Sequence, residues 1–434
     1  MASSTGRHVG WPLLAWTASR TVLLLSVFAV LPFPGPDAAA DLWTVYPNWY
    51  DVLATGRFPV GDVTWQYPPA AAIAVLAPAP LLPLLGYAAA FVLILILADA
   101  CVLLLLLRAG QPWRKGSLAS PPGAAGEDGT TRTTGAWFWV VGVPLLGPTA
   151  YARYDLLVTA VVVAALLVGV GRPRLLGAAA GLGALLKGWP LLLLLGIRRG
   201  RCARLAWVSA AVVMAALTLL FTLLMPGALA FLGYQRRRGM EIESVGALVF
   251  HVARHLGWSG GVQPNYGCME FMGPYVELVS MASVAMTVAC TAWLAVGRLR
   301  ARVYSAATLP HSTLTAVLLF ILTSRVISPQ YLLWLIGVVA VCLILPRPAM
   351  LRPAVLILLA TALTTLEFPV WFGHVVDSDW IGISLLVCRN GLLITAAVLS
   401  GRQVWQETVA PGARRPAMDL ASEQPNAQLI GPEV

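Results

Sequence analysis

The sequence predicts an all-α membrane protein, a polytopic bundle of helices. Hydrophobic residues make up 59% of the 434 residues and charged residues only 11%, whereas soluble domains contain about 25% charged residues. Runs such as 92–107 and 158–170 are long and do not alternate polar with apolar positions, as the strands of a membrane barrel would. A water-soluble fold is therefore excluded, and the spans are expected to be helices.

The number and direction of the spans follow from length and charge. A spanning helix needs about 20 apolar residues, so the chain has room for roughly twelve spans. The basic residues behind the net charge of +10 lie in short clusters between or after apolar segments, namely 198–204, 298–302, 347–352 and 414–415. Such clusters are typical of cytoplasmic loops beside anionic lipid. The expected partners therefore include membrane lipids and no nucleic acid.

The chain is expected to form one transmembrane domain over residues 1–405, with its N-terminus in the cytoplasm. Residues 34–69 and 226–273 are predicted to be long loops on the outside. Between Asp41 and Thr55 apolar residues recur at helical spacing, which predicts a helix lying in the membrane interface. Residues 108–135 are predicted to be a flexible loop, and residues 406–434 a disordered cytoplasmic tail.

The path of the chain is clear only in its second half. There the apolar segments near 205–225, 274–296, 304–324, 331–345, 353–372 and 381–400 alternate so that each basic cluster falls inside. Earlier, the candidate spans are 70–86, 87–107, 136–150, 155–171 and 175–197. If each crosses once, the basic pairs at 114–115 and 172–174 face outside, against the positive-inside rule. The alternative is that two of these segments are short or re-entrant.

Ionisable residues in or near a membrane are candidates for function, because inserting one at a helix centre costs about 2.5 to 3.5 kcal/mol. Asp41 lies just after the first span, beside aromatic residues. A carboxyl group at such a partly apolar site can act as a general base; alternatively, Asp41 is the N-cap of the interfacial helix. Tyr46, Asp62 and Tyr67 of the same loop are candidate substrate contacts.

A second concentration of charge lies in the outside loop 226–273. It reads Tyr234-Gln-Arg-Arg-Arg238-Gly-Met-Glu241-Ile-Glu243-Ser244. Arginines there can hold a phosphate or diphosphate through charge-assisted hydrogen bonds, which makes Arg238 and Glu243 candidate binding residues. The alternative is a surface helix in which Glu241 and Glu243 neutralise the arginines.

Two further cations, Lys187 and Arg325, stand within or at the end of apolar segments. A helix broken at Gly188 and Pro190 would turn the ammonium group of Lys187 toward a cavity. Arg325 ends a span on the same side as Asp41. A base and two cations around one outside cavity would suit a reaction in which a phosphate leaves while a hydroxyl is deprotonated. Snorkelling of the two side chains to the interface is the rival account.

The last outside loop carries His374, Asp377 and Asp379. His374 is a candidate acid, base or sugar contact, with a structural interfacial histidine as the alternative. Asp377 and Asp379 resemble a metal-binding pair, but two acids in a short loop are common by chance, and no metal is assigned.

The order of these motifs resembles that of a known family. Asp41 and Tyr46 are followed by Gly56-x-x-Pro59, Tyr67-Pro-Pro, Lys187-x-x-Pro190, Arg238-Gly-x-x-x-Glu243-Ser244 and Ser328-Pro329. This set is similar to the GT-C glycosyltransferases of family eighty-seven, which are polyprenol-phosphate-sugar-dependent mannosyltransferases and related actinobacterial proteins. The resemblance extends over most of the chain, from about residue 11 to 400.

The resemblance implies a GT-C fold and an inverting transfer of a hexose, with mannose as the first expectation. The donor would be a polyprenyl-phosphate sugar, and the acceptor a lipid, glycan or other component of the cell envelope. The reaction would take place on the extracytoplasmic face of the bacterial inner membrane, with Asp41 as the general base. The family implies no cofactor, because the lipid-linked donor is a co-substrate. Lys187 and Arg325 are assigned to its phosphate by their charge.

The chain departs from the family after Ser328-Pro329. The better-known mannosyltransferases continue with a Trp and a His pair, whereas this chain has Gln330 and Tyr331. Mannose is therefore in question, and His374 is the candidate replacement for the missing histidine. Two rival functions stay open. A transporter or lipid flippase would be favoured by inverted repeats with paired broken helices, and a non-catalytic envelope-assembly protein would function without Asp41.

Overall fold

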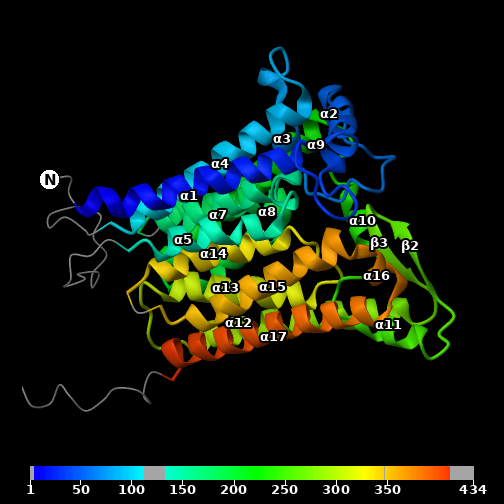
Figure 1. Ribbon diagram of the computed structural model, residues 1–434. Coiled ribbons are helices and arrows are strands. Elements are labelled where there is room, and N and C mark those ends of the chain that lie inside the picture. Colours follow the sequence, from blue (N-terminus) through cyan, green and yellow to red (C-terminus); the bar gives the residue numbers. More distant parts are fainter. Residues whose placement is uncertain (1–3, 112–131, 170, 347, 411–434) are drawn as a thin grey trace, which may run out of the picture.

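The computed structural model describes residues 4–111, 132–169, 171–346 and 348–410. Helices lie side by side, and short helices, loops and a small sheet gather at one end of them (Figure 1). Most of the predicted flexible loop, which falls between Ala109 and Thr134, lies outside the described residues, and so does most of the predicted tail. The first residues of that tail belong to the last helix, which continues to Thr408.

Five helices are long and apolar enough to cross a membrane. They are α4 (Tyr87–Ala109), α9 (Arg201–Leu224), α12 (Val276–Arg300), α15 (Leu351–Thr365) with the π-helical turn η5 (Leu366–Val370), and α17 (Trp380–Thr408). The remaining helices of the bundle are α1 (Ser4–Val27), α5 (Thr134–Gly142) with η3 (Pro144–Leu146), α7 (Asp155–Val168), α8 (Pro173–Lys187), α13 (Thr308–Thr323) and α14 (Tyr331–Ile344). The protein is therefore a predominantly helical membrane protein, as predicted.

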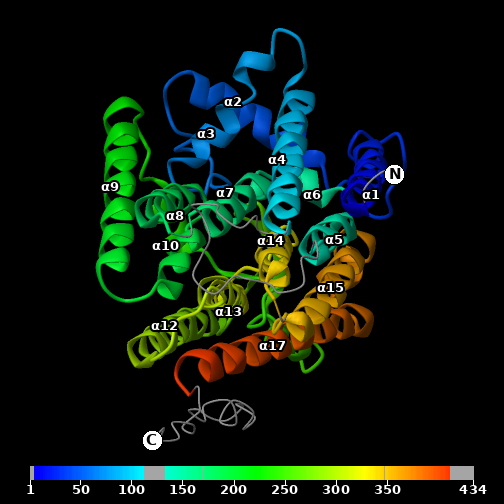
Figure 2. The same cartoon turned by 90° about the vertical axis from the view of Figure 1, so that its left-hand side faces the viewer.

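The core of the bundle surrounds α14. All of its residues from Leu332 to Leu343 are buried, and it packs against α4, α5, α7, α13 and α15. A helix that is apolar on every side must be covered on every side, and Figure 2 shows α14 in the middle of the molecule. By contrast, α9 and α12 lie at its periphery with most of their surface exposed (Figure 2).

Neither of the segments 70–86 and 175–197 is one continuous helix. The first contains only α3 (Ala71–Leu76) and the turn η2 (Ala79–Leu81), which are too short to cross a membrane. The second is divided between α8 and the 3₁₀ helix η4 (Trp189–Gly196). The break falls at Gly188, whose positive φ of 73° favours glycine, just before Pro190.

This division agrees with the alternative of two short or re-entrant segments, and the structure places one of the two basic pairs, 172–174; the pair 114–115 lies outside the described residues. The Ser209 hydroxyl of α9 donates to the carbonyl oxygen of Arg174 at 2.8 Å, so the start of α8 lies beside the first turns of α9, which carry Arg201 and Arg204. Figure 1 shows the start of α1 and the end of α17 at one end of the molecule. α2 and the sheet lie at the opposite end (Figure 1).

The first outside loop contains the helix that its sequence predicts. After the short turn η1 (Ala40–Leu42), α2 spans Val45–Ala54. Its buried residues are Tyr46, Trp49 and Leu53, a spacing that places all three on one face. α2 therefore packs by one face only, as an amphipathic helix does.

The loop 226–273 differs from the all-α expectation because it contains strands. β1 (Met240–Glu241), β3 (Cys268–Met272) and β2 (Gly261–Asn265) form an antiparallel sheet in the order β1-β3-β2. The short helices at this end are α6 (Thr149–Ala152), α10 (Phe231–Arg237), α11 (Leu248–Arg254) and α16 (Phe372–Asp377). Strands of two to five residues are too short to show a clear alternation in sequence.

Candidate functional site

Asp41 is held by an ion pair with Arg153, and it does not cap a helix. Asp41 lies inside η1, whereas the N-cap of α2 is Thr44 and that of η1 is Ala39. Its carboxylate contacts the guanidinium of Arg153, and the two side chains are 32% and 21% exposed. The N-cap interpretation is therefore wrong, and the carboxyl group is available to a molecule that approaches from outside the core.

The turn 153–155 joins Asp41 to the interior. Arg153 and Tyr154 connect α6 to α7, and Asp155 is the first residue of α7. The backbone N–H of Tyr154 donates to the hydroxyl of Tyr46 at 3.4 Å. The Tyr154 hydroxyl donates to the carbonyl oxygen of Leu186 at 3.0 Å. Arg153, the partner of Asp41, thus lies two residues before the buried acid Asp155.

Lys187 lies in an aromatic cage beside that acid. Its Nζ donates to Asp155 Oδ2 at 3.0 Å, and Trp334 Nε1 donates to Oδ1 at 2.9 Å. Nζ also lies 4.8 Å from the ring centre of Tyr67, 5.0 Å from that of Tyr154, 5.6 Å from that of Tyr331 and 5.9 Å from that of Trp334. Aromatic faces attract cations at these distances. Because the Lys187 side chain is only 8% exposed, snorkelling does not describe it.

The break after Lys187 is the one expected from Gly188 and Pro190. α8 ends at Lys187 and η4 begins at Trp189, so the lysine side chain leaves the end of a helix instead of its middle. This confirms the interrupted helix. The partner that the ammonium group meets, Asp155, was not expected.

Gln66 and Tyr331 link this cage to Arg238. The Arg238 guanidinium donates to Gln66 Oε1 at 2.8 Å, to Cys268 Sγ at 3.0 Å and to Glu270 Oε1 at 3.3 Å. Burial opposes its charge, but the neighbouring Cys268, Tyr331 and Glu270 raise the pKa of Arg238 above its ordinary value. Tyr331, whose ring lies beside Lys187, thus also contributes to the charged state of Arg238.

Arg325 holds the loop that carries Arg238. Its guanidinium donates to the carbonyl oxygens of Arg238 and Gln235, both at 2.7 Å. Within the described residues Arg325 forms no ion pair with a carboxylate. It therefore stabilises this loop through contacts with its backbone and keeps a positive charge beside Arg238.

Glu241 and Glu243 do not neutralise the arginines of a surface helix, so that alternative is wrong. Glu241 accepts from the backbone N–H of Ile327 at 3.0 Å and is buried, as is Glu243. Arg389 of α17 donates to the carbonyl oxygen of Glu243 at 2.6 Å and to Glu367 Oε1 at 2.9 Å. Glu243 thus belongs to a buried polar group against α17, separate from the Lys187 cage.

Burial also controls the ionisation of Glu243. Removal from water raises its pKa well above the ordinary value, and the neighbouring carboxyl groups of Glu241 and Glu367 raise it further, while Arg389 lowers it. Among the described residues its Oε1 atom has no hydrogen-bond partner. Burial and the two neighbouring acids therefore favour the protonated form of Glu243 over the ionised form.

The other predicted contacts divide between this site and its surroundings. Tyr46 is buried and reaches Tyr154, as described above. Asp62 accepts from Trp49 Nε1 at 2.9 Å and from the Thr64 N–H at 2.8 Å, so its carboxylate orders the loop. Gln330 is buried immediately before Tyr331, whose ring stacks on Trp334 with centroids 4.0 Å apart.

His374 lies in α16, away from the cage. Its Nδ1 is 2.5 Å from Asp379 Oδ2, and the two side chains are 40% and 42% exposed. Asp379 caps α17 by accepting from Ile381 N and Gly382 N, both at 3.0 Å. The hydrogen bond from Gly382 and then that from His374 lower the pKa of Asp379. These contacts are those of a helix-capping pair.

The sequence analysis did not identify Arg153 and Asp155, which are the partners of Asp41 and Lys187. Arg153 and Asp155 stand close together in a largely apolar stretch, so the rule that intramembrane charges mark function could have found them. The same rule points to Asp99, but that acid has a structural role. It accepts from Arg20 Nε at 2.8 Å, Trp16 Nε1 at 2.9 Å and Trp139 Nε1 at 2.6 Å, which ties α1, α4 and α5 together.

The apolar helices define a helical membrane protein, and acids, cations and aromatic rings gather at one end of its bundle. The profile of glycosyltransferase family 87 matches residues 65–329, which is more than half of the chain. The chain therefore belongs to glycosyltransferase family 87 and is a glycosyltransferase. No curated protein and no solved structure matches it.

The matched segment covers part of the site. Tyr67, Lys187, Arg238, Glu243 and Arg325 lie within it, as do Arg153 and Asp155. Asp41, Tyr46 and Asp62 precede it, and Gln330, Tyr331 and His374 follow it. The family match therefore does not test the general-base assignment of Asp41, which stays a prediction.

Proposed function

We propose that the protein transfers a hexose from a polyprenyl-phosphate donor to a cell-envelope lipid or glycan on the extracytoplasmic face of the inner membrane. The observation that carries this proposal is a group of two ion pairs, Asp41–Arg153 and Asp155–Lys187, joined by the turn 153–155; one pair holds a partly exposed carboxylate and the other lies in an aromatic cage. A membrane glycosyltransferase needs a base for its acceptor and cations for a phosphate leaving group. This group supplies both.

In the proposed step Asp41 removes the proton from an acceptor hydroxyl. The oxygen attacks the anomeric carbon of the donor sugar, a new C–O bond forms, and the bond from that carbon to the phosphate oxygen breaks. Its electron pair leaves with the polyprenyl phosphate, and the configuration at the anomeric carbon inverts. The proton stays on Asp41 until it is released to water, so the step needs no cofactor.

Cations near the base would balance the charge of the departing phosphate. Lys187 lies beside the rings of Tyr67 and Tyr331, Arg238 contacts Gln66, the residue before Tyr67, and Arg153 contacts Asp41. Guanidinium and ammonium groups in a site that excludes water stabilise developing negative charge far better than they do in bulk water. We propose that Lys187 and Arg238 bind the phosphate. Arg325 would hold the loop that carries Arg238 in place.

The sugar is expected to contact the aromatic residues around Lys187. Tyr67, Tyr154 and Tyr331 present their rings there. His374, in α16, is not part of this group. Tyr331 is therefore a better candidate than His374 for the position that a histidine holds in the family's mannosyltransferases. Mannose stays the first donor to test, with glucose and arabinose beside it.

The decisive experiment compares wild type, Asp41→Asn and Asp51→Asn with a panel of radiolabelled donors. Polyprenyl-phosphate mannose, glucose and arabinose are each supplied to membranes that contain the full chain. Asp51 is the matched control because it is an exposed acid of α2, ten positions after Asp41 in the same loop. We expect Asp41→Asn to lower transfer by about a hundredfold or more, the contribution of a general base, and Asp51→Asn to have little effect.

The outcomes separate the competing functions. Equal incorporation by wild type and Asp41→Asn would remove Asp41 as the base. Incorporation from none of the donors, together with movement of a lipid-linked sugar across vesicles, would favour the flippase interpretation. An unchanged envelope in cells that carry only Asp41→Asn would favour a non-catalytic assembly role.

A further inference from the structure

A basic hollow lies between α9 and α12 at the end of the molecule opposite the candidate site. It has a volume of about 430 Å³, within the range of small-molecule sites, about 300 to 1,000 Å³. Its walls are Arg199, Gly200, Ala203, Arg204, Trp207, Val208, Arg298 and Leu299. Three of these are arginines, and among the lining residues none is acidic.

Two of the arginines build the walls. Arg199 donates from its guanidinium to the carbonyl oxygen of Leu299 at 2.8 Å, and Arg298 Nε donates to the carbonyl oxygen of Ile197 at 3.3 Å. These reciprocal contacts fasten the loop before α9 to the end of α12. Each guanidinium keeps further N–H groups that do not take part in these bonds, and those can bind an anion.

The hollow lies at the end of the molecule that the basic clusters predict to be cytoplasmic. The backbone N–H of Arg302, just after α12, donates to the carbonyl oxygen of Thr408 at the end of α17, at 2.7 Å. That end of α17 lies opposite α2 and the sheet (Figure 1). The hollow is therefore distinct from the proposed donor site, and Arg199, Arg204 and Arg298 belong to the basic clusters expected beside the inner leaflet.

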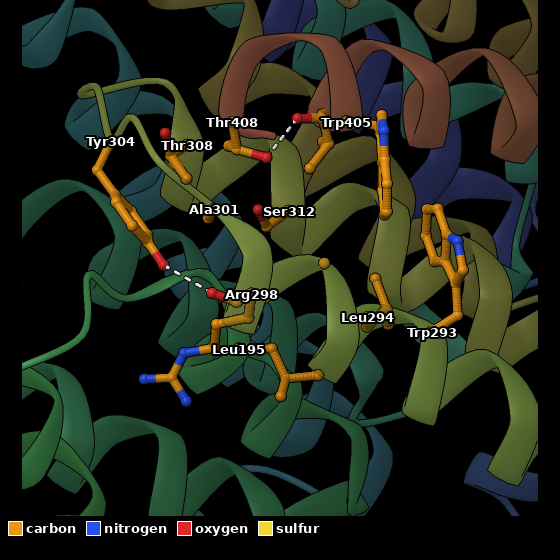
Figure 3. A pocket seen from close by; sticks show the side chains of 12 residues that line it. Leu195, Trp293, Leu294, Arg298, Ala301, Tyr304, Thr308, Ser312, Trp405 and Thr408 are labelled. Atoms are coloured by element: carbon orange, nitrogen blue, oxygen red, sulfur yellow. Dashed lines mark hydrogen bonds between the residues drawn. The ribbon is translucent and has the colours of Figure 1, made fainter. Parts of the chain in front are cut away.

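A neighbouring slot between α12, α13 and α17 does not suit a charged group. Trp293 and Trp405 stack there with centroids 6.0 Å apart, and the open volume is only about 30 Å³. Figure 3 shows the guanidinium of Arg298 directed away from these two tryptophans, with its carbonyl oxygen bound to the Tyr304 hydroxyl. The charge of Arg298 therefore serves the hollow and not the slot.

The surroundings of the hollow are apolar. Val208 is 60% exposed and Leu299 61% exposed, and few residues of α9 and α12 are buried inside the protein. Trp207 lines the hollow at the level of the arginines, as interfacial tryptophans do. An anionic group bound there would therefore have hydrocarbon beside it.

We infer that this hollow binds the phosphate headgroup of an anionic phospholipid from the cytoplasmic leaflet, with its acyl chains along α9 and α12. Basic pockets between spanning helices on this side are suited to anionic headgroups. Free phosphate has the same charge, but it would leave the exposed valine and leucine surfaces uncovered. The lipid matches both the arginines and the apolar walls.

The test is native mass spectrometry of the full chain in detergent, titrated with phosphatidylglycerol or, as the neutral comparison, phosphatidylcholine. The variants are Arg204→Gln, which removes a lining charge, and Arg201→Gln, an exposed arginine of the same helix turn that does not line the hollow. One arginine beside anionic lipid contributes about 1 kcal/mol, or about a fivefold change in affinity. We expect that loss for Arg204→Gln and little change for Arg201→Gln.

Each outcome decides the matter. Weaker phosphatidylglycerol binding by Arg204→Gln, restored by Arg204→Lys, supports the site. Equal binding by both glutamine variants, or equal binding of the two lipids to wild type, overturns it. Displacement of the lipid by millimolar inorganic phosphate would show an anion site that does not require lipid and would also overturn it. If Arg204→Gln unfolds, the same comparison uses Arg298→Gln against Arg302→Gln.

Discussion

The pair Lys187–Asp155 serves both the fold and the proposed reaction. The two side chains are 8% and 0% exposed, so loss of one partner would leave an uncompensated charge in a medium of low dielectric constant. Breaking a buried pair in this way costs about 3 to 5 kcal/mol, whereas replacing both partners by apolar residues of similar volume is often neutral. The two roles of Lys187 can therefore be measured separately.

We expect Asp155→Asn to lower the free energy of unfolding by about 3 kcal/mol. The double variant Lys187→Met with Asp155→Leu should recover most of that stability, because it leaves no unpaired charge. Sugar transfer should stay low in the double variant, since no ammonium group would face the donor phosphate. Thermal unfolding in detergent and the transfer assay measure the two effects. A stable double variant with full transfer would contradict the phosphate role of Lys187.

Single residues were predictable when their own position was unusual. Lys187 could be predicted as a functional residue because it is a charged residue that follows Leu185 and Leu186 and precedes Gly188. Its partner Asp155 lies 32 positions away, and nothing in the local sequence of either residue names the other. Ion pairs of this kind are set by the tertiary fold, so the sequence indicates the charges but not how they pair.

At the scale of elements, α8 and α9 touch through small residues. A Cβ atom built on Gly177 would lie 2.0 Å from the carbonyl oxygen of Ala206, and one on Gly181 would lie 2.7 Å from that of Ala210. Both glycines are therefore required for the approach of the two backbones. In membranes, where lipid tails are as apolar as leucine, such small-residue contacts stabilise helix pairs through close packing.

We expect Gly177→Ala to destabilise the protein by about 1 to 3 kcal/mol, the usual cost of overpacking, because the backbone of α9 must move away. The matched control is Gly391→Ala in α17, where a Cβ would meet nothing within 4 Å. That change should be neutral or stabilising by up to about 1 kcal/mol, since alanine favours a helix more than glycine does. Comparable melting temperatures for the two variants would contradict the close contact.

Helices were predictable from sequence where they are long, and less so where they are short. The segments expected near 331–345 and 353–372 correspond to α14 and to α15 with η5, because their apolar runs have sharp polar ends. β1 to β3 were missed, since a ladder such as Glu241 opposite Glu270 depends on residues that are distant in sequence. Nor does composition show that 175–197 turns back at Gly188.

At the scale of the whole molecule, the loop 226–273 contacts segments from both the first and the last part of the chain. Arg238 contacts Gln66 of the first outside loop, Glu241 contacts Ile327, and Glu243 contacts Arg389 of α17. The site therefore depends on how one loop packs between the first and last spans. Sequence order alone suggested that Arg238 and Glu243 act together, whereas the fold directs them to different groups.

The docking of this loop should depend on pH through Glu243. Its pKa is raised in the folded protein by burial, then by Glu241 and Glu367, against the opposing effect of Arg389. A carboxyl group with a raised pKa binds its proton more tightly in the folded than in the unfolded chain. Its stabilising effect is complete below the unfolded pKa of about 4.3 and is lost as the pH rises through the folded value.

We therefore expect the melting temperature of the wild type in detergent to fall as the pH is raised above about 5, with Glu243 contributing part of the slope. Glu243→Gln, which cannot ionise, should show a flatter profile. Glu277→Gln, an exposed position on α12, should keep the wild-type slope, so that a general effect of lost negative charge is excluded. Parallel profiles for Glu243→Gln and wild type would show that Glu243 is already ionised in the folded state, and that the loop docks on a charged pair with Arg389 instead of a protonated acid.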